Sequence, residues 1–290
     1  MTGVYDPETD TVFWGTGNPG PDWNGDVRKG DNLYSDCLIA LDPDTGRKKW
    51  HFQYTPHDVN DWDSTQTPSL VNATVAGQSR KMVVLANRNG FYYALDRVSG
   101  KFIAGRPYVK QSWATGLDET GRPMRVPGAE PTVEGKLIWP SLGGGSNWYS
   151  SAYSPKTDLY YVNVKEERAI YHKGEAEYRT GALFNGGGQN SYKAEEPYGA
   201  VRALEVATGK LRWEYKLHRP SHAGLMTTGG GLVFGSNLTS FFALDARSGN
   251  LLWRFETGGG IVANPITYMS EGNQYVVIAA GHALLVFGLD

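Results

Sequence analysis

Short apolar runs recur along the chain, and each is separated from the next by turn-forming residues. The runs are three or four residues long and comprise Met82–Leu85, Leu137–Trp139, Leu232–Phe234 and Tyr275–Ile278. Short runs rich in β-branched and aromatic residues, bounded by Gly, Pro, Asn and Asp, are typical of buried strands. The pattern predicts an all-β protein whose repeating unit is strand, turn, strand, short hairpin and strand.

One hairpin motif occurs four times. It reads Ala-Leu, an acidic residue, two variable residues, Thr or Ser, and Gly, and its copies begin at Ala40, Ala94, Ala203 and Ala243. Three copies continue to a tryptophan, at Trp50, Trp213 and Trp253. The acidic side chain can cap the turn, and Gly supplies the positive φ that the hairpin needs. The tryptophan on the returning strand offers a large flat surface for packing on the next unit.

Repeats of about 40–50 residues with four short strands are typical of β-propeller blades. We therefore predict a β-propeller in which residues 1–290 form about five blades, as part of a larger ring. A β-sandwich is the structural alternative, but a sandwich has no reason to repeat the hairpin motif. The Gly-rich and aromatic stretch from Tyr171 to Tyr198 breaks the pattern, and we expect it to be a long surface excursion between blades.

Composition narrows the function classes. The formal net charge of -2 gives no reason to expect nucleic acid or an anionic membrane as a partner. No apolar run approaches the ~20 residues of a membrane-spanning helix. The single cysteine, Cys37, lies in an apolar run and is expected to be a buried strand residue. The first residues carry no signal-peptide pattern and enter strand-like sequence at once, so we expect the chain to begin inside a longer one.

Three polar residues follow apolar strands in what looks like the same slot of successive blades. Asn18 follows Trp14-Gly15, Arg88 follows Leu85-Ala86, and Asn147 follows a run of three glycines. Equivalent positions of propeller blades point toward one central axis. Asn and Gly are ordinary turn residues, so each position alone is weak evidence, and the shared slot is what makes them candidates for one site.

The segment from Pro56 to Pro68 holds the sharpest candidate chemistry. If residues 61–63 are extended, Asp61 and Asp63 lie on one face and Trp62 on the other. Two neighbouring carboxylates repel each other unless a cation or proton lies between them. A hard cation with oxygen ligands satisfies both, with Asn18 as a neutral donor. The alternative is a solvated acidic turn. His57 is more simply a hydrogen-bonding structural residue than a base.

These segments resemble the PQQ-dependent methanol/ethanol dehydrogenase family, whose cofactor is pyrroloquinoline quinone. The resemblance rests on Gly15-Thr16-Gly17-Asn18-Pro19, Gly30-Asp31-Asn32-Leu33-Tyr34, Pro56-His57-Asp58 with Asp61, and Asn87-Arg88-Asn89-Gly90, and extends from residue 3 to nearly residue 290. It implies the C-terminal half of an eight-bladed propeller that oxidises alcohols.

The resemblance also implies roles for individual residues. Asn18 resembles the metal-ligating Asn of the family, and Asp61 its catalytic base and metal neighbour. Asp63 occupies the position at which an additional Asp accompanies lanthanide use, whereas calcium-dependent relatives carry a small residue there. Arg88 resembles the residue that hydrogen-bonds the reactive quinone carbonyls. Asn147 and Trp148 resemble the pair on the far side of the cofactor, and Ile261 a peripheral cofactor contact.

The implied reaction uses PQQ with Ca²⁺ or a lanthanide ion, a small alcohol as substrate, and a cytochrome c as electron acceptor in the periplasm. Asn60 is a departure, since many relatives carry Trp beside the base. The N-terminal half of the propeller is missing here; in the family it supplies a ligating Glu, a stacking Trp and a vicinal disulfide. We therefore expect this fragment alone to be inactive. The alternatives are a non-catalytic propeller scaffold that binds protein partners, and a calcium-dependent propeller hydrolase or sugar dehydrogenase.

Overall fold

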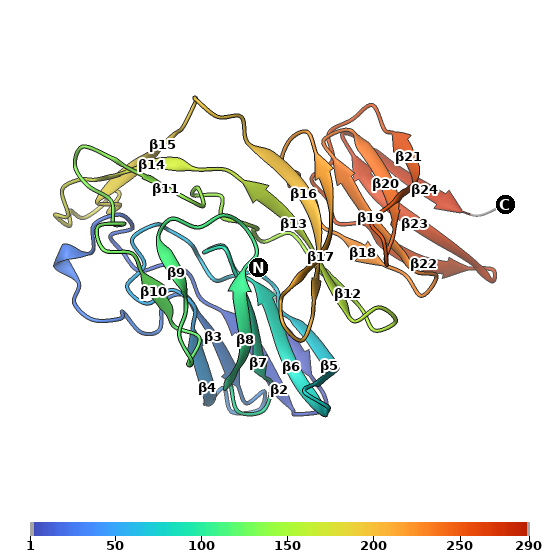
Figure 1. The fold of residues 1–290 in the computed structure, drawn as a ribbon, viewed down its shortest axis with the longest axis horizontal. Helices are drawn as coiled ribbons and strands as arrows, with labels where there is room; N and C mark the ends of the chain where they lie inside the picture. Colours follow the sequence, from blue (N-terminus) through green and yellow to red (C-terminus); the bar gives the residue numbers. More distant parts are fainter. Residues whose placement is uncertain (1–2, 289–290) are drawn as a thin grey trace. The chain divides into compact units, whose positions relative to one another are not determined.

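The computed structural model describes residues 3–288, and antiparallel β-sheet dominates it (Figure 1). Contacts between residues divide the chain into two units. Unit 1 contains the described residues up to Trp148 together with Glu166–Pro197 and Ala207–Gly209. Unit 2 contains Tyr149–Lys165, Tyr198–Val206 and the described residues from Lys210 onward. No helix in the described part of the chain is long and apolar enough to cross a membrane.

Unit 1 contains two four-stranded antiparallel sheets whose strands follow chain order. The first consists of β1 (Val4–Asp6), β2 (Thr11–Gly15), β3 (Cys37–Leu41) and β4 (Lys48–Gln53). The second consists of β5 (Ser69–Val75), β6 (Gln78–Ala86), β7 (Phe91–Asp96) and β8 (Phe102–Pro107). The 3₁₀ helix η1 (Gly25–Val27) lies in the long β2–β3 connection. Four strands in chain order are what a propeller blade requires.

Two smaller sheets complete unit 1. They are β9 (Ala114–Leu117) with β10 (Pro123–Arg125), and β11 (Lys136–Ile138) with β14 (Ala169–Lys173) and β15 (Gly187–Ser191). The stretch predicted as a surface excursion between blades thus contributes to a sheet, and Tyr171 within it is fully buried. It is also inserted within one blade, between the second and third strands, so the predicted position between blades is wrong.

That interrupted blade belongs to unit 2. Its strands are β12 (Ala152–Ser154), β13 (Leu159–Glu166), β16 (Tyr198–Glu205) and β17 (Leu211–Leu217). The next sheet consists of β18 (Met226–Thr227), β19 (Leu232–Asn237), β20 (Ser240–Asp245) and β21 (Leu251–Glu256). The last sheet contains β22 (Ile266–Ser270), β23 (Asn273–Ala280) and β24 (Ala283–Gly288). The all-β prediction is confirmed.

The repeated hairpin motif joins the third and fourth strands of its blade, and its chemistry is as predicted. Asp96 Oδ1 accepts hydrogen bonds from the backbone N–H and the hydroxyl of Ser99, at 2.8 and 2.7 Å. In all four copies the strand register shifts at the Ala-Leu pair, which is a β-bulge or similar irregularity. Register shifts of this kind bend a strand and increase its twist. The repeat therefore encodes one backbone shape four times.

In two of the four copies, the glycine of the motif contacts the tryptophan of another blade. A Cβ on Gly100 would lie 2.6 Å from Cε3 of Trp50, and a Cβ on Gly249 would lie 2.6 Å from Cε3 of Trp213. Both glycines have positive φ. Each of these two indoles therefore packs on a backbone that has no side chain. This confirms, for these copies, the prediction that the tryptophan packs on the next repeat. Cys37 is fully buried in β3, also as predicted.

Candidate functional site

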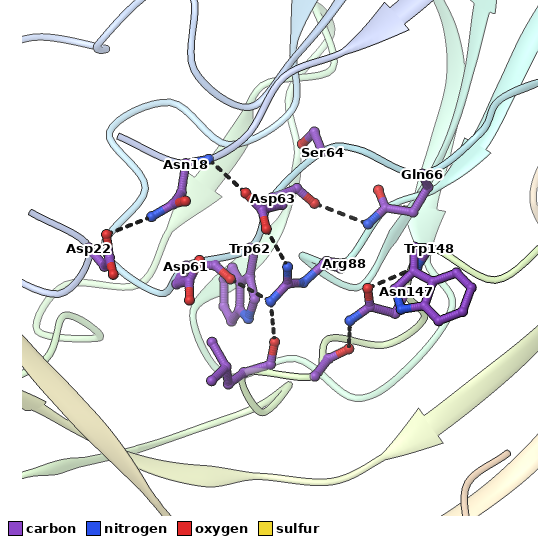
Figure 2. A network of polar contacts seen from close by, with 12 residues as sticks. Asn18, Asp22, Asp61, Trp62, Asp63, Ser64, Gln66, Arg88, Asn147 and Trp148 are labelled. Carbon is purple, nitrogen blue, oxygen red and sulfur yellow. Dashed lines mark hydrogen bonds and ion pairs between the residues drawn. The ribbon is translucent and has the colours of Figure 1, made fainter. Parts of the chain in front are cut away.

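The loop between β4 and β5 carries Asp61 and Asp63. The loop is not extended at Asp61, whose φ of +58° lies in the left-handed region. Trp62 is fully buried, its ring centroid lies 5.0 Å from that of Trp113, and its Nε1 donates to the Ser141 carbonyl oxygen at 3.0 Å. The indole anchors the loop in the core, and the two carboxylates beside it lie near Arg88 (Figure 2).

Arg88 connects the two acidic residues. It lies between β6 and β7, where Asn87 and Asn89 fix the turn through buried hydrogen bonds. Its Nη1 forms an ion pair with Asp63 Oδ2 at 2.8 Å, and its Nη2 donates to the Asp61 carbonyl oxygen at 2.7 Å (Figure 2). The side chain is only 10% exposed. Hydrogen bonds to a charged donor in such a place are strong, so Arg88 fixes the loop at both residues.

Asn18 lies opposite Arg88 across Asp63. Its backbone N–H donates to Asp63 Oδ1 at 3.0 Å, and its side-chain Nδ2 donates to Asp22 Oδ1 at 3.0 Å (Figure 2). A Cβ on Gly17 would lie 2.5 Å from Asp63 Oδ1, so only glycine permits this close approach. The predicted group of Asn18, Asp61, Asp63 and Arg88 is therefore brought together.

Acidic groups dominate the electrostatics of this site. The pKa of Asp61 is raised to about 7, chiefly by burial and further by the carboxylates of Asp63, Asp58 and Asp22, against the opposing effect of Arg88. Burial also raises the pKa of Asp22. A cation placed among these groups would favour their ionised forms. Within residues 3–288, however, no three His, Cys, Asp or Glu side chains are grouped closely enough to hold a metal by themselves.

The loop that carries Asn147 and Trp148 packs directly on Arg88. The Gly145 N–H donates to the Arg88 carbonyl oxygen at 3.0 Å, and Arg88 Nη2 donates to the Leu142 carbonyl oxygen at 2.7 Å. Asn147 Nδ2 donates to the Gly143 carbonyl oxygen at 3.0 Å, and its Oδ1 accepts the Trp148 N–H (Figure 2). Asn18 and Arg88 each follow the second strand of their sheet, β2 and β6, as the predicted shared slot requires. The loop with Asn147 instead precedes β12, the first strand of a sheet, so the prediction is wrong for Asn147.

A cavity of about 270 Å³ opens where this loop meets Arg88. Its lining is mainly polar and consists of Arg88, Ser141, Leu142, Gly143, Asn147, Glu167, Arg168, Ala169, Gln189 and Ser191. The excursion thus contributes walls to the cavity through Gln189 and Ser191 of β15. Arg88 and Asn147 both face a space that could hold a polar ligand.

Two further residues from the sequence analysis make structural contacts of their own. Ile261 belongs to unit 2, where it is 3% exposed and packs in a core cluster with Phe234, Phe241 and Ile278. Its contact with a cofactor stays a prediction. His57 Nδ1 lies 2.8 Å from the Gly30 carbonyl oxygen, in agreement with a structural role.

Three acidic residues near the site were missed from the sequence. Asp22 contacts Asn18, while Asp36 and Asp58 are fully buried and interact electrostatically with Asp61. Neither oxygen of Asp36 has a hydrogen-bond partner, and burial raises its pKa well above the usual range. Only Asp58 carried a sequence signal, since it lies within the segment that contains Asp61.

Comparison with known proteins places these observations in a family. The family model for the PQQ glucose/ethanol/alcohol dehydrogenase β-propeller domain matches residues 2–116 and 215–276, more than half of the chain. The quinoprotein alcohol dehydrogenase PedH of Pseudomonas putida is 42% identical over 97% of this chain and 49% of its own length. The lanthanide-dependent methanol dehydrogenase of Methylacidiphilum fumariolicum is 37% identical over 96% of this chain and 47% of its own length.

Solved structures agree with these sequence relatives. The quinohemoprotein alcohol dehydrogenase of Comamonas testosteroni superposes with a TM-score of 0.91 at 34% identity, over 98% of this chain and 44% of that one. A europium-containing methanol dehydrogenase superposes with a TM-score of 0.89 at 36% identity, over 96% of this chain and 50% of that one. The predicted propeller is thereby confirmed. The chain spans about half the length of the curated relatives that it matches.

Proposed function

Because this chain belongs to the family of PQQ-dependent glucose, ethanol and alcohol dehydrogenase β-propeller domains, we propose that it supplies the catalytic base and part of the metal and cofactor shell of an alcohol dehydrogenase. One observation carries the proposal: Arg88 bonds to Asp61 and to Asp63 at once, beside Asn18. A non-catalytic scaffold has no need of this buried charged group.

The donor set fits a hard cation. Asn18, Asp61 and Asp63 would hold Ca²⁺ or a lanthanide ion, because carboxylate and amide oxygens are the ligands that such ions prefer. The surplus of negative charge around Asp61 is the structural reason to expect a cation here. The remaining ligands would come from PQQ and from the half of the propeller outside this chain. When bound, PQQ would supply the electrophilic carbonyl as hydride acceptor.

Asp61 acts as the general base. Without a cation, its burial and acidic neighbours raise its pKa to about 7. A neighbouring cation would favour the ionised carboxylate, and the carboxylate accepts the proton of the substrate hydroxyl. Because Arg88 holds the Asp61 carbonyl oxygen, the backbone that carries the base is fixed in place.

Arg88 and the 141–148 loop bind the cofactor in this proposal. The guanidinium would hydrogen-bond the quinone oxygens, while Asn147 and Trp148 would contact the far side of the cofactor and Ile261 its periphery. The cavity between Arg88 and Asn147 supports this arrangement. The substrate is a small alcohol, and a cytochrome c in the periplasm accepts the electrons.

We also propose that the chain forms about five blades of an eight-bladed propeller, and that the chain alone is inactive. Among the described residues, four four-stranded sheets and the sheet of β22–β24 have the blade pattern. The remaining blades would supply the other metal ligands, so experiments on activity use the complete enzyme.

Alcohol-dependent dye reduction tests the proposed base. The complete enzyme, reconstituted with PQQ and either Ca²⁺ or La³⁺, should reduce a dye when a primary alcohol is added. Asp61→Asn should lower kcat by at least about 100-fold, because it removes a proton acceptor. Its melting temperature should not fall, since a neutral amide is easier to bury than this carboxyl. Activity of Asp61→Asn within tenfold of the wild type would refute Asp61 as the base. No alcohol-dependent activity in any preparation would refute the proposed function and favour a scaffold.

Asp63 should determine the choice of metal. Asp63→Ala removes a carboxylate that a trivalent ion needs more than a divalent one, so lanthanum-supported activity should fall much more than calcium-supported activity. Luminescence of bound Tb³⁺ gives a second readout, because Trp62 lies between the two carboxylates and absorbs the exciting light. Equal losses with both ions would contradict a role of Asp63 as a lanthanide ligand.

A further inference from the structure

Asp58 is a fully buried carboxyl group three residues before the proposed base. Its oxygens are occupied by backbone groups of its own loop: Oδ1 accepts the Asn60 N–H at 3.0 Å, and Oδ2 accepts the Trp62 N–H at 2.8 Å. These two N–H groups belong to the residues immediately before and after Asp61. One carboxylate therefore ties together the backbone on both sides of Asp61.

From this geometry we propose that Asp58 is a positioning residue, which holds Asp61 in the left-handed conformation that presents its carboxylate to the substrate; this rests on the function proposed above. Residues other than glycine adopt this region at an energetic cost, so the conformation persists only where its surroundings impose it. The Asp61 φ of +58° turns the next N–H inward, and Asp58 Oδ2 accepts it there.

Asp58 can do this because it is itself fixed. Arg28 Nη2 donates to the Asp58 carbonyl oxygen at 2.5 Å, and Arg125 Nη2 donates to the carbonyl oxygen of the preceding His57 at 2.8 Å. Both arginines are partly buried, which reduces the competition of bulk water for these bonds. These two bonds hold the backbone at His57 and Asp58 in place. The Asp58 side chain therefore has a fixed position from which it accepts the two N–H groups around Asp61.

The other anchors of the loop lie beyond the base. Arg88 holds the Asp61 carbonyl oxygen, and the Trp62 indole is fixed in the core. Without the Asp58 carboxylate these anchors still hold the loop near its place, but both flanking N–H groups lose their acceptor. The peptide units around Asp61 can then rotate, and its carboxylate points elsewhere. The protein should therefore fold and bind its cofactors while its base is misplaced.

Asp58→Asn and Asp58→Ala in the complete enzyme separate positioning from folding. Asn keeps the shape and one acceptor oxygen, whereas Ala keeps neither. Misplacement of a catalytic group by about 1 Å can cost about 100-fold in rate. We expect kcat to fall by about this factor for Ala and less for Asn, with PQQ content, metal content and the KM for alcohol near wild-type values.

Asp6→Asn is the matched control. Asp6 is another buried Asp whose Oδ1 accepts the N–H two residues later, that of Glu8 at 3.1 Å, but it lies in β1 outside the site. It should lower stability and leave kcat unchanged. If kcat of the Asp58 variants stays within twofold of the wild type, or falls only in proportion to lost PQQ or metal, the inference is wrong.

A structural readout does not depend on activity. In crystal structures of Asp58→Asn and Asp58→Ala, the φ of residue 61 should leave the left-handed region or the loop should show several conformers, most clearly for Ala. An unchanged φ with the carboxylate in its original place overturns the inference even if the enzyme oxidises alcohols. A complete wild-type enzyme without alcohol-dependent activity would instead refute the proposed function alone, and the φ measurement would still decide the role of Asp58.

Discussion

Gly100 offers a direct test of how neighbouring blades pack. A Cβ added there would lie 2.6, 2.7 and 3.2 Å from Cε3, Cδ2 and Cγ of the Trp50 ring. The first two distances are shorter than real contacts allow, so the ring or the hairpin must move. Overpacking of this kind costs about 1–3 kcal/mol. The positive φ of +73° adds about 1–2 kcal/mol for any residue with a Cβ.

Gly77 separates these two contributions. It lies in the β5–β6 turn of the same sheet with a φ of +78°, and a Cβ there would have no atom within 4 Å. Gly77→Ala should therefore cost only the backbone contribution, about 1–2 kcal/mol. Gly100→Ala should cost about 2–5 kcal/mol, because the contact with Trp50 is added.

Chemical unfolding of the purified protein, followed by tryptophan fluorescence, measures both costs. The unfolding midpoint of Gly100→Ala should be clearly lower than that of Gly77→Ala at an unchanged denaturant slope. Combining Gly100→Ala with Trp50→Leu should recover part of the loss, since the smaller side chain relieves the contact. Equal midpoints for the two glycine variants would refute the packing of Trp50 on Gly100.

Three further predictions concern buried charge and close packing. Burial raises the pKa of Asp36, so this carboxyl does not destabilise the fold below pH ~4, where it is protonated in both the folded and the unfolded chain. Folding stability falls as the pH rises through the folded-state pKa of Asp36. Asp36→Asn in the metal-free protein should therefore raise the melting temperature at pH 8 and hardly change it at pH 4. Arg97→Ala leaves Asp6 buried without its 3.0 Å ion-pair partner and should lower the free energy of unfolding by about 3–5 kcal/mol, and a loss below 1 kcal/mol would contradict this. Gly144→Ala places a Cβ 2.8 Å from the Cα and Cβ of Arg88 and should lower kcat by about 10- to 100-fold, whereas unchanged kcat would show that the position of Arg88 is not critical.

The hairpin motif was predictable because its chemistry is local. Asp96 and Gly100 act within a few residues of each other, and the same letters produce the same turn in each copy. Asn147 was misplaced because the short strands β9, β10 and β11 intervene between the second four-stranded sheet and β12, and the sequence contains no mark of which strands belong to a blade. The excursion was assigned to the wrong place for the same reason.

The site itself was only partly readable. Asn18, Asp61, Asp63 and Arg88 stand in recognisable motifs, and the structure brings them together. The extended conformation considered for residues 61–63 is absent, because the backbone is turned at Asp61 by contacts on both sides.

Buried acids outside those motifs could not be found from the sequence. Asp36 lies within ordinary strand-flanking sequence, and its proximity to the site arises only when β3 packs beside the loop after β4. Buried carboxyl groups normally have hydrogen-bond or ion-pair partners, whereas Asp36 is fully buried and neither of its oxygens has a hydrogen-bond partner. Composition and patterning therefore predict an exposed residue here.

A single-turnover isotope experiment tests the central claim most directly. The complete enzyme, loaded with PQQ and La³⁺ or Ca²⁺, is mixed without oxygen with a primary alcohol that carries either hydrogen or deuterium at C1, and cofactor reduction is followed by absorbance. The account predicts alcohol-dependent reduction that is several-fold slower with deuterium, and its loss in Asp61→Asn. Absence of reduction by the alcohol, or undiminished reduction in Asp61→Asn, would contradict the assignment of this chain as the base-bearing part of an alcohol dehydrogenase.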